Sequence, residues 1–169
     1  AAAFLVARSI KSAQSRETAL SYVAGAQARA GDIKAALATA AGIKSEFWHD
    51  AALRNCGVEQ AKAGDFSGAF VTAKNISKRW GMGTQVLTAI SLAHAVAGDF
   101  DLAFSTVQEL RSKGEALASI AAEQAKDGEI LEATTTIRKI PKVTVLIRAF
   151  NEVALILASR PKAVPHNSK

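Results

Sequence analysis

The chain is poor in the residues that build disulfide frameworks and metal sites, and it lacks the long apolar runs of membrane spans. Its 169 residues include one cysteine, three histidines and three prolines. A single cysteine excludes a disulfide framework within one chain, and Cys56 beside the small Gly57 is typical of a buried structural thiol. No apolar run approaches the roughly 20 residues that a membrane-spanning helix requires, so we expect no membrane span.

The motifs of catalytic and cofactor sites are also missing from the sequence. His49, His94 and His166 stand alone, and there is no His-x-x-x-His, Cys-x-x-Cys or phosphate-binding glycine loop. The two glycines of residues 80–83 follow no strand pattern and precede no Lys-Ser/Thr pair, so this segment is interpreted as a linker. We therefore expect no enzyme activity, no metal and no cofactor.

What the chain does contain is one short segment repeated four times, at residues 27–33, 60–66, 94–100 and 124–130. In each copy an alanine-rich stretch ends in Gly-Asp or Gly-Glu and continues with an apolar residue. The glycines are 33, 34 and 30 residues apart: Gly31, Gly64, Gly98 and Gly128. Self-similarity at this period predicts a solenoid of stacked supersecondary units.

Each glycine is interpreted as the junction between a first and a second helix of one unit. Glycine adopts the left-handed conformation that often follows a helix C-terminus, where a Cβ atom is penalised. Asp32, Asp65 and Asp99 are then predicted as N-caps of the second helices. Glu129 complements the helix dipole but caps poorly. The chain is thus predicted to consist of helical pairs joined by tight turns, without a strand.

Alignment on the glycines shows positions that stay apolar or small. The first helix carries a leucine eleven residues before the glycine, at Leu20, Leu53, Leu87 and Leu117. The second helix carries an alanine five residues after it, at Ala36, Ala69, Ala103 and Ala133. Large residues are expected to fill the core, and small residues let two helix backbones approach closely.

A polar column interrupts this pattern four residues before each glycine, at Gln27, Gln60, His94 and Gln124. One interpretation is that these side chains satisfy backbone groups at the seam between helices, as buried polar groups must. The alternative is that they form hydrogen bonds to a ligand.

The pattern resembles the tetratricopeptide repeat, a helical hairpin of about 34 residues that stacks into a right-handed superhelix. The leucine, a small residue, the Gly64-Asp65-Phe66 turn and the alanine after it carry the resemblance, which covers residues 1–158. The family's aromatic residue four before the glycine is replaced by the polar column, and Pro141 alone comes near its repeat-ending proline. Residues 96–114 are also similar to the pentatricopeptide repeat, a related RNA-binding hairpin.

The resemblance implies an all-α, right-handed α-α superhelix, a solenoid of about five stacked hairpins, over residues 1–159. The expected units are roughly 1–32, 33–65, 66–99, 100–129 and 130–159, followed by a basic flexible tail at residues 160–169. Residues 3–10 match residues 36–43, so the chain opens within a unit, and we expect it to be a piece of a longer parent.

The implied function is a non-enzymatic scaffold or assembly subunit that binds a protein or peptide partner. In tetratricopeptide stacks the first helices line a concave groove, which here corresponds to positions ten and two residues before each glycine. The predicted groove residues, with one from the closing helix, are Arg29, Arg54, Lys62, Thr88, Lys126 and Arg148. Their cations and the net charge of +6 favour an acidic helical or extended segment, although such cations are often simply solvated.

RNA is the alternative partner, because phosphate neutralisation supplies most nonspecific affinity for nucleic acids. Ser21 and Thr88 fit the base-reading positions of a pentatricopeptide repeat, whereas Arg54 and Ala118 do not. The predicted groove also lacks the aromatic residues on which bases stack.

Two further surfaces are candidates for binding. Trp48 and Trp80 are predicted in equivalent loops between units, either plugging the edge of the seam or anchoring a partner. The helix expected at residues 142–158 is unusually apolar for a terminal unit, whose outer face is normally polar. We expect further chain, a second copy or a partner to cover it.

Overall fold

The computed structural model describes residues 2–160, which form ten α-helices and no strand. The helices are α1 (Ala2–Ser9), α2 (Ala13–Arg29), α3 (Ile33–Ala41), α4 (Glu46–Lys62), α5 (Phe66–Asn75), α6 (Met82–Val96), α7 (Phe100–Gln108), α8 (Gly114–Asp127), α9 (Ile130–Arg138) and α10 (Val143–Ala158). The predicted all-α class is therefore confirmed for this range. Not one of these ten helices has the length and apolar character needed to cross a membrane.

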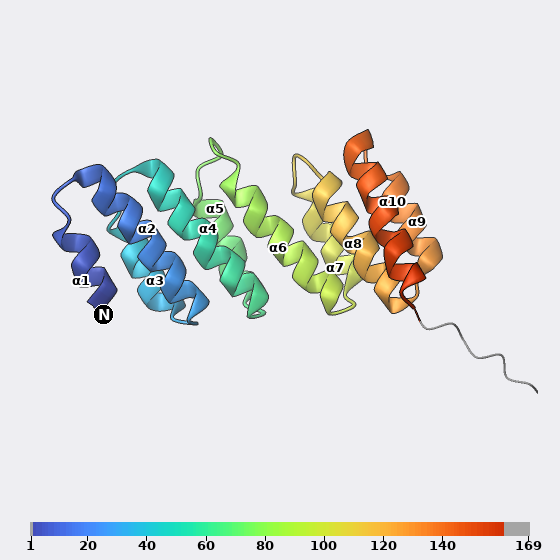
Figure 1. The fold of residues 1–169 in the computed structure, drawn as a ribbon, viewed down its shortest axis with the longest axis horizontal. Helices are drawn as coiled ribbons and strands as arrows, with labels where there is room; N and C mark the ends of the chain where they lie inside the picture. The colour runs from blue at the N-terminus through green and yellow to red at the C-terminus, as the bar shows by residue number, and fades with distance from the viewer. Residues whose placement is uncertain (1, 161–169) are drawn as a thin grey trace, which may run out of the picture.

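The helices form an elongated row that runs from α1 at one end to α10 at the other (Figure 1). The even-numbered helices, here called the first layer, pack side by side in the order α2, α4, α6, α8 and α10. The shorter odd-numbered helices form the second layer. Each of α3, α5, α7 and α9 packs against the first-layer helix that precedes it, so each pair is a helical hairpin.

In the turn inside each hairpin, the predicted glycine adopts the left-handed conformation. The backbone φ angles of Gly31, Gly64, Gly98 and Gly128 are +83°, +80°, +79° and +98°, in the left-handed region. The carboxylate of Asp32 accepts a hydrogen bond from the Ala35 amide, and that of Asp65 accepts one from the Gly68 amide. Asp99 stands at the N-cap position of α7 without such a bond, so its predicted cap is only positional.

The core lies between the two layers and follows the aligned positions. Ala36, Ala69, Ala103 and Ala133 are fully buried. Leu20, Leu53 and Leu117 are buried as well, while Leu87 is half-buried and packs against both large apolar clusters, one spanning α1 to α6 and the other α6 to α10. A Cβ atom added to Gly57 would lie 2.7 Å from Val86 Cγ1, which shows how closely α4 and α6 approach.

Arg160, the last described residue, connects the segment after α10 to α8. The Arg160 guanidinium donates to the carbonyl oxygens of Ala125 and Lys126, at 2.6 Å each. These carbonyls belong to the last turn of α8, where helix carbonyls lack their usual partner four residues on; that of Ala125 also accepts from the Gly128 amide, at 3.3 Å. Arg160 is therefore placed in the fold rather than in the predicted tail, and residues 161–169 of that tail lie outside the described residues.

Candidate interaction surfaces

Three members of the polar column are bonded to threonines of the second layer. Thr39, Thr72 and Thr136 donate from Oγ1 to Oε1 of Gln27, Gln60 and Gln124, at 2.7, 2.7 and 2.8 Å. Each threonine lies twelve residues after its glutamine. The predicted role at the seam is thus correct, but the partners are side-chain hydroxyls rather than backbone groups. The recurrence of threonine eight residues after every glycine was the signal for this pairing.

His94 breaks this arrangement in the third hairpin. The hydroxyl of Thr106 donates instead to the Leu102 carbonyl of its own helix. The His94 ring lies against the ring of Phe66, with centroids 3.9 Å apart, and its buried Nδ1 has no hydrogen-bond partner among the described residues. The His94 ring thus packs on α5 of the preceding hairpin, and no side-chain bond equivalent to the glutamine–threonine pair joins α6 to α7 here.

The predicted groove residues divide into exposed and packed groups. Arg29, Lys62 and Lys126 are exposed in the last turns of α2, α4 and α8. Arg54 and Thr88, ten residues before their glycines, are half-buried. Arg54 Nη1 reaches from α4 to Gln85 Oε1 of α6, at 3.1 Å. Arg54 therefore takes part in the contact between neighbouring first-layer helices, while the Thr88 hydroxyl bonds the Thr84 carbonyl of its own helix.

Six small residues of the first layer are buried. They lie under the exposed surface of the first layer: Gly25, Ala28, Ala61, Ala95, Ala122 and Ala125. Asn55 illustrates the reason, because its side chain lies over Gly25 and would be 2.7 Å from a Cβ atom there. The small residues lie where neighbouring helices contact each other, and longer polar side chains form the exposed surface.

Acidic side chains of the first layer pair with three of the groove cations. Lys62 Nζ lies 2.9 Å from Glu59 Oε1, and Lys126 Nζ lies 2.7 Å from Glu123 Oε1. Arg148 of α10 pairs with Glu115 of α8. The lysine side chains are 63% and 54% exposed, against 21% and 16% for their glutamates. Solvent and any partner therefore meet the ammonium groups first.

The two tryptophans occupy unequal places at one edge of the row. Trp48 lies in the first turn of α4, not in the predicted loop, because the helix begins at Glu46 after Ser45. Trp80 lies in the turn before α6. The Phe47 ring stands edge-on to both, at 5.0 Å from Trp48 and 5.3 Å from Trp80 between centroids. Trp48 packs against the core, whereas Trp80 is 42% exposed.

Cys56 is fully buried against Ala28 and Ala36. Burial raises the pKa of its thiol from the ordinary 9.0 to about 11, so the thiolate that would act as a nucleophile is disfavoured at neutral pH. Within residues 2–160, no three His, Cys, Asp or Glu side chains gather closely enough to hold a metal ion.

Comparisons with known proteins identify no relative of this chain. No protein-family model matches the chain, and no curated protein or solved structure is significantly similar to it. The candidate surfaces therefore rest on the geometry of this chain.

Proposed function

We propose that the chain is a tetratricopeptide-like, right-handed α-α superhelix that acts as a non-enzymatic interaction scaffold, binding an acidic protein segment along the first layer. One observation carries the proposal. Exposed cations recur at the same position of three first-layer helices, two residues before the glycine: Arg29, Lys62 and Lys126. The carboxylates of an acidic partner segment would each meet one of these cations along one extended surface.

A structural role for the same cations has to be separated from binding. They lie at helix C-termini, where a positive charge interacts favourably with the helix dipole by about 0.3–1 kcal/mol. Loss of stability after charge removal would therefore follow under either role. Only a change in partner affinity at unchanged folding distinguishes them.

Protein is favoured over RNA because the first layer offers few planar groups for base stacking. The exposed aromatic side chains of this layer are Tyr22, Phe47 and Phe150, at 67%, 39% and 41%, and none of them lies at the cationic positions two residues before the glycine. Stacking on aromatic side chains contributes about 1–3 kcal/mol per base in single-stranded nucleic-acid binding. RNA binding remains a distinct outcome of the test.

The test compares charge reversal on the two layers. Lys62→Glu with Lys126→Glu is expected to weaken binding of fluorescent glutamate-rich peptides by about tenfold, since each exposed charge pair contributes about 0–1 kcal/mol. The effect should shrink as salt screens the field. Fluorescence anisotropy with the peptides and with single-stranded RNA measures both affinities.

Matched controls come from the second layer. Lys34→Glu with Lys74→Glu changes the net charge equally, at exposed positions of α3 and α5. Peptide affinity should be nearly unchanged in this control. Equal losses in both variants would show that the cations act only through overall charge. Binding of RNA with a steep salt dependence, but not of acidic peptides, would replace the proposal.

A further inference from the structure

The two ends of the row are incomplete in complementary ways. Among the described residues, α1 is a second-layer helix that no first-layer helix precedes. At the other end, α10 is a first-layer helix that packs on α8 and α9, and no second-layer helix follows it within residues 2–160. Within residues 2–160, each end therefore presents the face that a hairpin partner covers elsewhere in the row.

The open face of α10 is the one that α8 buries. Arg148 pairs with Glu115, which sets a register of 33 residues between the two helices. In this register Phe150 corresponds to Leu117. Leu117 is 5% exposed beneath α9, but Phe150 is 41% exposed. Ile147, one turn before it, is 54% exposed.

The open face of α1 shows the same difference. Residues 3–10 align with residues 36–43, so Ala3 corresponds to Ala36 and Val6 to Thr39. Ala36 and Thr39 are at most 4% exposed, whereas Val6 is 66% exposed and Ala3 is also exposed.

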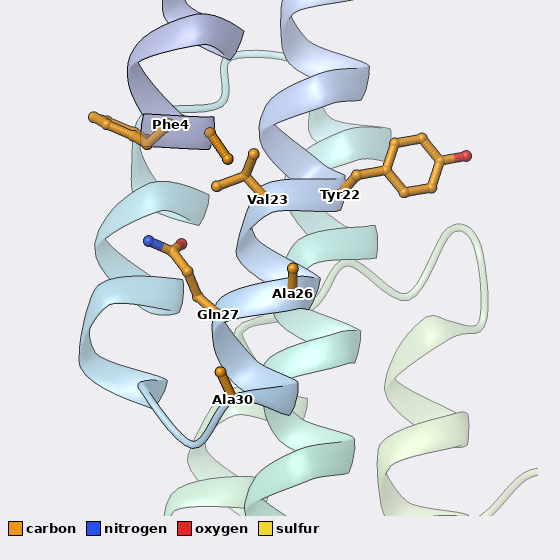
Figure 2. A pocket seen from close by; sticks show the side chains of 7 residues that line it. Phe4, Tyr22, Val23, Ala26, Gln27 and Ala30 are labelled. Carbon is orange, nitrogen blue, oxygen red and sulfur yellow. The ribbon is translucent and has the colours of Figure 1, made fainter. Parts of the chain in front are cut away.

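A cavity of about 380 Å³ between α1 and α2 adjoins this face, with an apolar lining that includes Ala3, Phe4 and Val23. Figure 2 shows Val23 projecting from α2 toward α1, while the Tyr22 ring points away. An apolar helix laid against α1 would cover this opening.

The side chains at the two ends match in polarity. In complete hairpins, the residue seven before the glycine meets the residue five after it, as Ser91 Oγ shows by donating to the Ala103 carbonyl at 3.0 Å. Four before the glycine, a glutamine meets a threonine eight after it. Joined ends would place Ala154 against Ala3 and Leu157 against Val6.

The second of these pairs carries the argument for a second copy. Both members of the usual glutamine–threonine pair have become apolar, one at each end of the same chain. A glutamine packed on Val6, or a threonine packed under Leu157, would lose its hydrogen bond on burial, which costs about 1–3 kcal/mol. Each end is thus better matched to the other end than to a typical member of the row.

We propose that α10 of one copy docks on α1 and α2 of a second copy, so that the chain associates head to tail. The contact joins two different surfaces, and such heterologous contacts build rings or open filaments rather than closed two-fold dimers. Head-to-tail association is independent of the acidic partner proposed above.

Sedimentation velocity of the 169-residue chain, from low to high micromolar concentration, measures the association. The average mass should rise with concentration above the 17.7 kDa of one chain. Val6→Glu and Phe150→Glu should each hold the chain near the mass of a monomer, because each buries a charge in the contact. Circular dichroism should show unchanged helicity, since both side chains are exposed. If Phe150→Glu lowers helicity, Ile147→Glu replaces it.

Mixing the two variants gives the sharpest outcome. The Val6→Glu chain keeps a functional α10 and the Phe150→Glu chain keeps a functional α1, so an equimolar mixture should form dimers and nothing larger. Leu131→Glu, at a 76% exposed position of α9, is the control that should associate like the original chain. A monomer at every concentration would overturn the proposal. Sensitivity to Phe150→Glu but not to Val6→Glu would also overturn it, because that pattern indicates a symmetric contact between two α10 helices.

Discussion

At the scale of single residues, glycine fixes where each first helix ends. Gly64 has a φ of +80°, and no atom lies within 4 Å of the place where its Cβ would stand. Steric room is therefore not the constraint. The cost of a side chain there comes from the left-handed backbone conformation alone.

Gly64→Ala is therefore expected to lower the free energy of unfolding by about 1 kcal/mol. Gly42→Ala is the matched control, because Gly42 also follows a helix but has a φ of −81° and room for ordinary contact with the Thr39 carbonyl. Urea unfolding followed by circular dichroism measures both. Equal stabilities of the two variants would mean that the Gly64 turn does not require positive φ.

At the scale of helices, sequence spacing predicted the junctions and the buried face, but not every contact between units. Glycine, aspartate and alanine recur because each local turn and each pair of helices has the same requirement. Arg54 and Thr88 were assigned to a groove; both are half-buried, and Arg54 also reaches Gln85 of the neighbouring helix α6. Contacts of this kind depend on the register between units, which a pattern within one unit does not reveal.

The threonine–glutamine bond between α4 and α5 gives a prediction at this scale. Thr72→Val should destabilise the chain by about 1 kcal/mol, because it leaves Gln60 Oε1 without its donor in a buried seam. Thr106→Val should cost less, since the Thr106 hydroxyl bonds only the Leu102 carbonyl of its own helix. Thermal unfolding of the two variants compares them. A larger loss for Thr106→Val would reject a stabilising role for this bond.

At the scale of the whole molecule, the order of helical hairpins could be predicted from the sequence, but the electrostatics of the first layer could not. The glutamates that pair with Lys62 and Lys126 lie three residues before them, outside the two positions used to define the groove. The apolar character of the α10 helix was visible in the sequence. Which face it leaves open, and that α1 leaves a matching face, required the packing of the row.

Site-specific photocross-linking in the native cells determines whether partners bind on the first layer. A benzophenone amino acid at Val96, 64% exposed on α6, is compared with one at Leu131, 76% exposed on α9 of the second layer. Mass spectrometry of the products identifies what each position touches. We expect Val96 to capture a protein through an acidic segment and Leu131 to capture little. Lys62→Glu with Lys126→Glu should reduce the yield at Val96. Capture of the same protein at Leu131 but not at Val96, or of RNA at Val96, would contradict the proposed binding on the first layer.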